Sequence, residues 1–354
     1  MSNRYYHLKV KEIVRETSDT ITIHFEQPAQ PIPYRPGQFL TLIVNINGEV
    51  VRRSYSMCSS PHADKTLAVS VKRVSNGKVS NFLNDKLKSG DTLEIMEPMG
   101  NFSPNLNPNS QRHLVLFGAG SGITPLISII KSVLATETRS QVSLIYGNRD
   151  TQSIIFRTQL EALQAQYGGR FQVIHVLSQP EDSWNGHQGR LNQTLILKLL
   201  EHLPNVEKAD TEFYMCGPEG LMEEAKKALA IMHVPKERIH KESFLASTTP
   251  APAPEEEVVS KVIIAREVTV IYEGSEYKFT VTPKQSILEA ALDQDIDLPY
   301  SCQSGMCTAC RGKCLSGKVK MDEEDGLSDH ELKEGYVLIC VGHPLTGNVV
   351  IEVD

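Results

Sequence analysis

The sequence lacks any long apolar run and any apolar segment near its N-terminus. Its longest uncharged stretch, residues 114–130, is interrupted by three glycines and by Pro125, whereas a membrane-spanning helix needs about 20 predominantly apolar residues. Residues 1–19 carry charges of both signs and no apolar core of the kind that signal peptides contain. We therefore expect no membrane span and no secretory leader.

Cysteine is also scarce, with seven residues in a chain of 354. Four of them form a motif near the C-terminus, and the other three form no evident disulfide framework, which is typical of a reducing compartment. We therefore expect a cytoplasmic protein. The length predicts two to three domains, at roughly 100–200 residues for each domain.

The chain has no net positive charge, since its formal net charge is −7, and this charge balance does not favour nucleic-acid binding. The charge is unevenly distributed. Residues 262–354 contain eight Lys and Arg against sixteen Asp and Glu, a net charge of −8, and residues 1–245 contain twenty-seven against twenty-four, a net charge of +3. This asymmetry favours electrostatic docking, within the chain or with a partner. A merely solvated acidic surface explains it equally well.

Four cysteines near the C-terminus have the spacing of an iron–sulfur ligand set. Cys302, Cys307 and Cys310 follow the pattern C-x4-C-x2-C, and twenty-nine residues separate Cys310 from Cys340. This is the plant-type [2Fe–2S] pattern, in which a loop supplies three thiolates and a distant segment supplies the fourth. The small residues of the loop, among them Gly305, let backbone N–H groups approach the cluster closely. The spacing predicts an electron-transfer centre.

Two alternatives to this assignment concern the metal and the fourth ligand. Structural zinc favours two short C-x2–4-C pairs, and the sequence contains no second pair of that kind. Cys314 is a rival fourth ligand, but C-x4-C-x2-C-x3-C does not match the C-x2-C-x2-C-x3-C run of four-iron clusters. We interpret Cys314 as a bystander.

The clearest domain boundary is the segment 246–261, in which Ala and Pro alternate before three consecutive Glu. Such a sequence builds no core and is typical of a semi-rigid linker. After it, two alternating strands (268–272 and 277–281), a helix (286–292), the cysteine loop and a final strand (349–353) predict an α+β domain of β-grasp type over residues 262–354.

Two further domains precede the linker. Residues 1–107 contain short alternating runs separated by Pro and Gly, which predict an antiparallel β-barrel or sandwich. In residues 108–245, strands and helices alternate, which predicts a doubly wound α/β domain with a parallel sheet. The expected strands there are 114–117, 141–146, 171–176 and 212–215, and the expected helices are 124–134, 158–166, 193–202 and 221–232.

The segment Arg53-Ser-Tyr55-Ser56 has the residue types that a flat redox-active ring with a pyrophosphate requires: a cation, an aromatic ring and hydroxyl groups. A second basic element follows, with Lys72 and the run Lys78-Val79-Ser80 after Gly77. That run is placed to open a helix whose N–H groups bind phosphate. An ordinary polar strand edge is the alternative explanation.

Residues 118–125, the glycine-rich turn, lie between an expected buried strand and an expected helix. Gly118, Gly120 and Gly122 follow the spacing G-x-G-x-G, in a position where a nucleotide pyrophosphate approaches backbone amides. Cys216-Gly217-Pro218 also follows a strand and precedes a helix, at the edge where open α/β sheets bind ligands. An ordinary strand-to-helix turn and a buried structural thiol are the alternatives.

Together these elements resemble the ferredoxin–NADP reductase superfamily over essentially the whole chain. They occur in the order found in the fused reductase components of bacterial oxygenases, with the flavin domain first and the ferredoxin domain last. The resemblance implies FAD as the flavin and a protein electron acceptor. It also implies roles for single residues. Arg53, Tyr55 and Ser56 would hold the isoalloxazine, and Lys78, Val79 and Ser80 would hold the flavin pyrophosphate. Thr124 would lie at the flavin–nicotinamide junction, and Cys216 would lie beside the transferred hydride.

The expected activity is an NAD(P)H-dependent oxidoreductase that passes electrons to FAD, then to [2Fe–2S], then to an oxygenase or hydroxylase. A flavin links the two carriers because it accepts hydride and releases single electrons. A desaturase or a haem protein is an alternative acceptor. A stand-alone flavin oxidoreductase with its own substrate is a further alternative, but no inserted segment suggests a substrate pocket.

The nicotinamide nucleotide is expected to be NADPH, with NADH as the alternative. The second strand of the parallel sheet leads into Gly-Asn-Arg149-Asp150, the region that usually selects between a ribose hydroxyl and a 2′-phosphate. Arg149 has the chemistry to bind a phosphate, and Ser153 adds a hydroxyl group. Asp150 opposes a phosphate, and a surface pair between Arg149 and Asp150 alone is the alternative. Similar segments occur in NADPH-using members of the family that the chain resembles.

Overall fold

A computed structural model describes residues 5–204, 208, 210–244, 265–324 and 326–353. The expected linker, 246–261, lies outside these residues. The described chain forms two compact units, one made of residues 5–98 and 102–243, and the other containing the C-terminal part. No helix among the described residues is long and apolar enough to cross a membrane.

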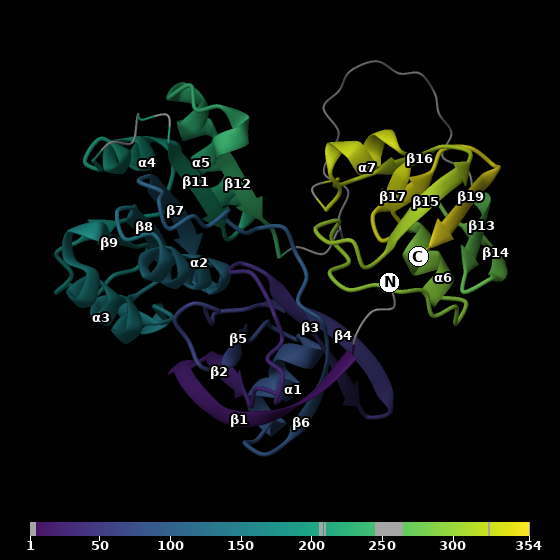
Figure 1. The fold of residues 1–354 in the computed structure, drawn as a ribbon, viewed down its shortest axis with the longest axis horizontal. Helices are drawn as coiled ribbons and strands as arrows, with labels where there is room; N and C mark the ends of the chain where they lie inside the picture. The colour runs from purple at the N-terminus through teal and green to yellow at the C-terminus, as the bar shows by residue number, and fades with distance from the viewer. Residues whose placement is uncertain (1–4, 205–207, 209, 245–264, 325, 354) are drawn as a thin grey trace. The chain divides into compact units, whose positions relative to one another are not determined.

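The N-terminal part of the first unit is a six-stranded antiparallel sheet (Figure 1). A bridge between Met57, directly after β4, and Val69 of β5 joins the two edge strands, so that the sheet curls into a barrel. The predicted barrel is confirmed. The strands lie in the order β4-β3-β6-β1-β2-β5, with bounds β1 Tyr5–Thr17, β2 Thr20–Phe25, β3 Phe39–Ile46, β4 Glu49–Ser56, β5 Leu67–Lys72 and β6 Thr92–Met96.

One strand of the barrel, β1, was not predicted from the sequence. Charged residues fill much of it, and most of its side chains are exposed or half-buried, so it lacks the clear alternation that marks the other strands. The barrel interior is filled by buried aliphatic and aromatic side chains, among them Phe25, Leu42 and Val69. Helix α1, Lys78–Lys86, follows β5 and covers part of this core through Val79 and Leu83.

The second part of this unit is a parallel six-stranded sheet with helices on both faces (Figure 1). Apolar residues of α2 and α3 share one core cluster with the sheet, and those of α4 and α5 share another. The predicted doubly wound sheet is confirmed. Its order is β10-β9-β8-β7-β11-β12, with bounds β7 His113–Ala119, β8 Gln141–Asn148, β9 Phe171–Leu177, β10 His187–Gln188, β11 Thr211–Cys216, β12 Ile239–Glu242, α2 Ile123–Thr136, α3 Arg157–Tyr167, α4 Gln193–Leu200 and α5 Glu219–Ile231.

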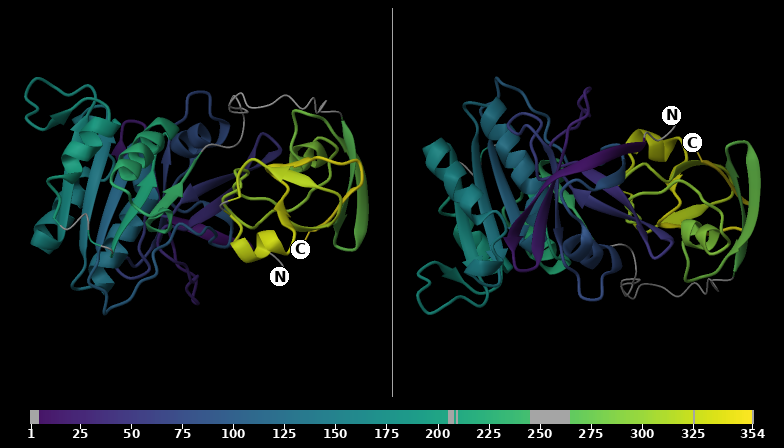
Figure 2. Two further views of the ribbon diagram at one scale, coloured as in Figure 1. Left: turned by 90° about the horizontal axis from the view of Figure 1, so that it is seen from above. Right: turned by 90° about the horizontal axis from the view of Figure 1, so that it is seen from below.

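The C-terminal unit is a mixed five-stranded sheet with a short two-stranded sheet and two helices (Figure 2). Ser286 and Glu289 form a capping box that fixes the start of α6. The predicted β-grasp plan is confirmed. The order is β14-β13-β19-β15-β17, with bounds β13 Arg266–Tyr272, β14 Ser275–Val281, β15 Arg311–Ser316, β17 Tyr336–Leu338, β19 Val349–Val353, then β16 Val319–Met321 and β18 Gly342–Pro344, α6 Ile287–Leu292 and α7 Asp329–Lys333.

Candidate functional site

The Arg-x-Tyr-Ser segment forms the C-terminal half of β4. Because side chains alternate along a strand, Arg53 and Tyr55 share one face and Ser56 lies on the other. Tyr55 packs against the barrel core, and its burial raises the pKa of its hydroxyl, so that it stays neutral. Ser56 is buried and pairs with Phe39 of β3. The arrangement presents a rigid aromatic side chain beside an exposed guanidinium.

The predicted phosphate-binding run opens helix α1. Gly77 is its N-cap, and no side chain caps the helix, so the first-turn N–H groups are available to an anion. A Cβ added at Gly77 would lie 2.6 Å from Ser80 Oγ, which itself accepts a hydrogen bond from Val74 N at 3.1 Å. Lys78 is exposed and pairs with Glu49. The geometry suits a pyrophosphate bound at the helix end.

Lys72 lies at the boundary between the barrel and the parallel sheet. Its ammonium group is 3.7 Å from Asp19 Oδ2 and would lie 3.9 Å from a Cβ added at Gly120. Gly120 has φ +52°, which favours glycine. The structure therefore places Lys72 over the glycine-rich turn, apart from the other residues of the basic element with which the sequence grouped it.

The glycine-rich turn and the Cys-Gly-Pro segment lie against each other. They end the neighbouring parallel strands β7 and β11, in which Gly118 is in register with Cys216. A Cβ added at Gly122 would lie 2.0 Å from the backbone oxygen of Cys216, and one added at Gly217 would lie 3.2 Å from Ala119 N. A side chain is excluded at Gly122 and would be tight at Gly217, so the backbones of the two distant motifs lie directly against each other.

Thr124 and Cys216 occupy the ends of the two elements that meet there. Thr124 is 3% exposed, and its hydroxyl donates to Ser121 O at 3.0 Å. Cys216 is fully buried, and burial with the nearby Glu242 carboxylate raises the pKa of its thiol well above the ordinary value. Cys216 is therefore a neutral thiol here, suited to packing beside a nucleotide rather than to nucleophilic attack.

The helices at these positions share one feature, an N-terminus without a side-chain cap. No side chain caps α1, α2 or α5, which follow Gly77, Gly122 and Pro218. Helix α3, which follows Phe156, also lacks a side-chain cap, whereas α4 and α6 are capped by Asn192 and Ser286. In a first turn without a side-chain cap, N–H groups can donate to an anionic ligand, and the positive end of the helix dipole favours its binding.

Arg149 and Asp150 pair with each other after β8. Arg149 Nε donates to Asp150 Oδ2 at 3.1 Å, and the Arg149 side chain is 64% exposed. Burial opposes ionisation of Asp150, but hydrogen bonds from Arg149 and Ser153 hold its pKa below the ordinary value. Ser153 completes a capping box with Asp150 at 2.8 Å. The phosphate contacts expected of Arg149 and Ser153 stay a prediction.

Asn148, the last residue of β8, was not singled out from the sequence. Both polar atoms of its amide are buried and make no hydrogen bond of ordinary geometry in the described structure, although the amide interacts with the Tyr146 hydroxyl. The neighbouring Tyr146 hydroxyl donates instead to Gly120 O at 2.9 Å. An unpaired buried amide costs about 1–3 kcal/mol, and here it lies at the carboxyl edge of the sheet, where a nucleotide would supply partners. The only signal for Asn148 in the sequence was its position at the end of an expected strand.

The four predicted cluster ligands come together in the C-terminal unit. Cys302 Sγ lies within hydrogen-bonding reach of Cys307 and Cys340, and Cys340 within reach of Cys310. These contacts lower the pKa of Cys302, and hydrogen bonding and burial raise the pKa of Cys307. Ser304 N donates to Cys302 Sγ at 3.4 Å. Three buried thiols and the half-buried Cys302, with one N–H donor at Ser304, form the donor set that an iron–sulfur cluster requires.

The described residues hold no group of three or more His, Cys, Asp and Glu side chains placed as the ligands of a single metal ion. The fit to a cluster therefore rests on the donor set and on the loop around it. Gly326 N donates to Gly305 O at 2.8 Å, and a Cβ added at Gly326 would lie 2.9 Å from Cys307 N. Gly326 itself therefore packs against the cysteine loop.

Cys314 lies apart from these contacts, in strand β15. Its thiol donates to Ser316 O at 3.3 Å, and burial raises its pKa. It packs partly against the core of the C-terminal unit. This position fits its interpretation as a bystander.

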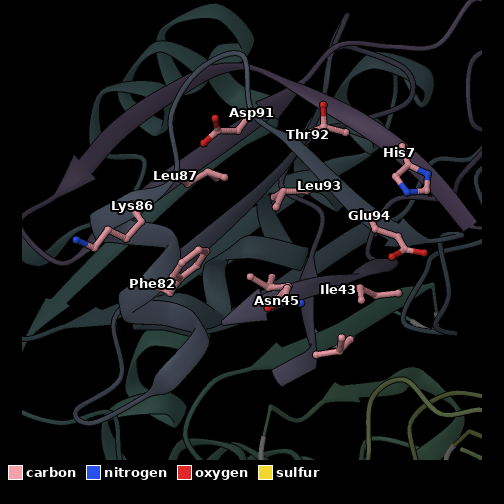
Figure 3. A pocket seen from close by; sticks show the side chains of 12 residues that line it. His7, Ile43, Asn45, Phe82, Lys86, Leu87, Asp91, Thr92, Leu93 and Glu94 are labelled. Atoms are coloured by element: carbon pink, nitrogen blue, oxygen red, sulfur yellow. The ribbon is translucent and has the colours of Figure 1, made fainter. Parts of the chain in front are cut away.

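A cavity of about 540 Å³ opens on the barrel (Figure 3). It exists because β3 pairs with β6 only at two positions, Leu42 with Ile95 and Ile43 with Glu94, after which the strands diverge. Phe82 and Leu87 from the α1 segment line its other side. None of the residues predicted to bind a cofactor lines this cavity.

Three family models match successive parts of the chain. An oxidoreductase FAD-binding domain matches residues 6–103, an oxidoreductase NAD-binding domain residues 116–227, and a 2Fe-2S iron-sulfur cluster binding domain residues 270–345. The chain is 37% identical to one of the subunits of 1,2-phenylacetyl-CoA epoxidase from Escherichia coli, over 99% of this chain and 98% of that protein. The chain belongs to the ferredoxin–NADP reductase superfamily.

Other relatives give the same organisation. The ferredoxin reductase component of 3-ketosteroid-9-alpha-monooxygenase from Rhodococcus rhodochrous is 36% identical over 98% of this chain and 96% of its own length. The structure of phthalate dioxygenase reductase has a TM-score of 0.62 and 26% identity, covering 99% of this chain and 98% of that chain. The protein is an NAD(P)H-dependent oxidoreductase with FAD and a [2Fe–2S] cluster, of the type found as reductase components of oxygenases.

Proposed function

We propose that this reductase delivers electrons from NAD(P)H, through FAD and [2Fe–2S], to the oxygenase component of a multicomponent oxygenase in the cytoplasm. The observation that carries the proposal is similarity over essentially the full length to proteins named as reductase components or subunits of such systems. The seven cysteines are all free in the structure, which supports a reducing compartment.

The roles of the site residues form part of the proposal. β4 supplies Arg53, Tyr55 and Ser56 to the isoalloxazine, and the first turn of α1 supplies Lys78, Val79 and Ser80 to the flavin pyrophosphate. The glycine-rich turn, Thr124 and the Cys216-Gly217-Pro218 segment bind the nicotinamide nucleotide. Lys72 lies above the turn, Asn148 ends β8, and Arg149 and Ser153 follow β8. Cys302, Cys307, Cys310 and Cys340 are the cluster ligands.

We further propose that electrons pass from the nicotinamide domain, 108–245, to the flavin domain, 1–107, and then to the ferredoxin domain, 262–354, with 246–261 as a linker. Limited proteolysis within the linker tests this order. The larger fragment is expected to keep NAD(P)H-dependent ferricyanide reduction, because that needs the flavin and nicotinamide sites alone, and to lose cytochrome c reduction. Full cytochrome c reduction by the fragment would show that the cluster is not on the route.

The acceptor is tested with the native partner. Affinity purification of the tagged protein from its own organism, followed by mass spectrometry, is expected to recover an oxygenase component. Single-turnover product formation by that component, with NAD(P)H and this reductase as the electron source, then confirms the assignment. Electron delivery to the recovered protein without oxygenation of any substrate would overturn it.

A haem protein is the second candidate acceptor. The structure of an intact type IV self-sufficient cytochrome P450 monooxygenase is similar to this chain, with a TM-score of 0.69 and 25% identity. The match covers 98% of this chain and 41% of that chain. This match supports the candidate because a similar reductase region is there part of a cytochrome P450 chain. Reduction of a purified cytochrome P450 by this protein, followed at the carbon monoxide difference band, separates the two candidates.

The preference for NADPH is expected to depend on Arg149. Its pairing with Asp150 is largely exposed, and such surface pairs contribute about 0–1 kcal/mol, so a phosphate with two negative charges can displace it. Arg149→Ala is expected to lower kcat/KM for NADPH about tenfold, which corresponds to about 1.4 kcal/mol. The kcat/KM for NADH is expected to stay unchanged.

Arg157→Ala is the matched control for this prediction. Arg157 lies in the same domain, is 53% exposed and pairs with Glu161 at 3.1 Å, much as Arg149 pairs with Asp150. Replacing Arg157 with alanine is expected to change neither the kcat/KM for NADPH nor that for NADH. Better turnover with NADH in the unmodified protein would reject the preference for NADPH.

A further inference from the structure

Three polar side chains form a stripe along α2, at spacings of three and four residues, which places them on one face of the helix. All three bind the barrel loop 59–64. Ser128 Oγ donates to Ser59 O at 2.6 Å, Ser132 Oγ lies 2.7 Å from Ser60 Oγ, and Lys131 Nζ lies 2.5 Å from Asp64 Oδ2. The loop belongs to the barrel, and the helix belongs to the parallel-sheet domain.

The contact between α2 and the loop 59–64, called the seam below, is largely buried. Ser128, Ser132 and Ser60 are fully buried, and the Lys131 side chain is 7% exposed. Apolar packing continues around the polar contacts, because Cys58 and Ala68 of the barrel belong to the same core cluster as the apolar residues of α2. The two domains therefore share an interior here, and they meet as parts of one packed body.

The loop itself is held firmly to the barrel. Tyr34 OH donates to Ser59 Oγ at 2.9 Å, and Ala68 N of β5 donates to the same atom at 3.0 Å. Ser60 N donates to Asp64 Oδ2 at 2.7 Å. The loop is thus hydrogen-bonded to β5, and Met57, directly after β4, bridges to Val69 of β5. A displacement of α2 is therefore expected to reach the end of β4, the strand that precedes the loop.

The seam lies between the two elements assigned to cofactors. The loop begins three residues after Ser56, the end of the proposed flavin strand, and the stripe begins four residues, or about one helical turn, after Thr124. Only a few residues separate the seam from Ser56 on one side and from Thr124 on the other, so the contacts of the seam set the relative position of these two residues.

We propose that Ser128, Lys131 and Ser132 are positioning residues that hold the flavin strand and the glycine-rich turn at the separation required for hydride transfer. The proposal rests on the flavin and nicotinamide assignments of the proposed function. It predicts an effect on the transfer step alone, because none of the three side chains belongs to the proposed contacts with either cofactor. A misplacement of about 1 Å is enough to slow such a step by about 100-fold.

Lys131→Met in the full-length holoprotein is the main test, with stopped-flow reduction of the flavin by NADPH. The limiting rate at saturating NADPH is expected to fall at least tenfold, and the Kd for NADPH to change less than twofold. FAD content, the reduced-cluster EPR signal and reduction by dithionite are expected to remain unchanged. Loss of FAD binding or a raised Kd with an unchanged limiting rate would instead point to a failure of the site assignments.

Ser132→Ala is the second variant, and it is mild. Ser60 Oγ keeps hydrogen bonds from the backbone N–H groups of His62, at 3.1 Å, and Ala63, at 3.2 Å, so no buried group loses its only partner. We expect the same change as in Lys131→Met, a lower limiting rate at constant Kd, but only about two- to threefold in size, since a single neutral hydrogen bond is lost.

Lys227→Met is the matched control, because Lys227 of α5 also pairs with a carboxylate, Glu224, but is 57% exposed. It is expected to leave every measured value unchanged. An unchanged limiting rate in folded Lys131→Met would overturn the proposal. If Lys131→Met does not fold, an unchanged limiting rate in Ser132→Ala overturns it in the same way, since that variant cuts one of the three contacts.

Discussion

Replacing Cys340 with serine is expected to abolish the EPR signal of the reduced [2Fe–2S] cluster and to lower cytochrome c reduction to background. Cys340 is 6% exposed and lies within reach of Cys302 and Cys310. A serine hydroxyl is a far poorer iron ligand than a thiolate, because it stays protonated and is a harder donor. NAD(P)H-dependent ferricyanide reduction is expected to persist, since the flavin and nicotinamide residues belong to the other unit.

Cys314→Ser is the control for this experiment, and it is closely matched. The Cys314 thiol donates to Ser316 O at 3.3 Å, and a serine hydroxyl can donate to the same oxygen. We expect the EPR signal and cytochrome c reduction to be preserved. Loss of the signal in Cys314→Ser together with its preservation in Cys340→Ser would reverse the ligand assignment.

Gly122→Ala is expected to abolish most NAD(P)H-dependent reduction of the flavin. The added Cβ would lie 2.0 Å from Cys216 O, 2.5 Å from Cys216 C and 2.8 Å from Gly217 N. All three are backbone atoms, so the clash cannot be relieved by a side-chain rotation, and the ends of β7 and β11 must move apart. We expect kcat/KM to fall about 100-fold, as for other displacements of about 1 Å at a reacting site, and stability to fall by about 1–3 kcal/mol.

Gly169→Ala is the matched control. Gly169 lies in the same domain, just before β9, and a Cβ added there would meet no atom within 4 Å. Its kcat/KM and its melting temperature are expected to stay close to those of the unmodified protein. Full activity in Gly122→Ala would show that the glycine-rich turn tolerates a side chain and does not form the nucleotide surface with Cys216.

The features that were predictable from the sequence are those whose chemistry is local. Three cluster cysteines lie in nine consecutive residues, and the glycine-rich turn lies directly between a strand and a helix. Strong apolar patterns also predicted the elements themselves: the expected helix 124–134 is α2, Ile123–Thr136, and the expected strand 171–176 is β9, Phe171–Leu177. Such signals depend only on neighbours along the chain.

Other features were missed because their patterns are weak or their partners are distant. β1 is rich in charge and mostly exposed, and β16, β17 and β18 have three residues each, too few to show an alternation. Arg149 is a different case. Its sequence context suits both a phosphate contact and a pair with Asp150, and only the nucleotide decides between them.

The sequence by itself determined the three domain types and the order of the motifs, and it predicts which cysteines hold the cluster, because spacing and hydrophobic period are properties of the chain. The tertiary structure alone decided which motifs meet. Gly122 touches Cys216 only because β7 and β11 are neighbours in the sheet, and Lys131 meets Asp64 only because α2 packs on the barrel. Strand order and helix packing follow from the total burial of all elements together, and no local pattern encodes them.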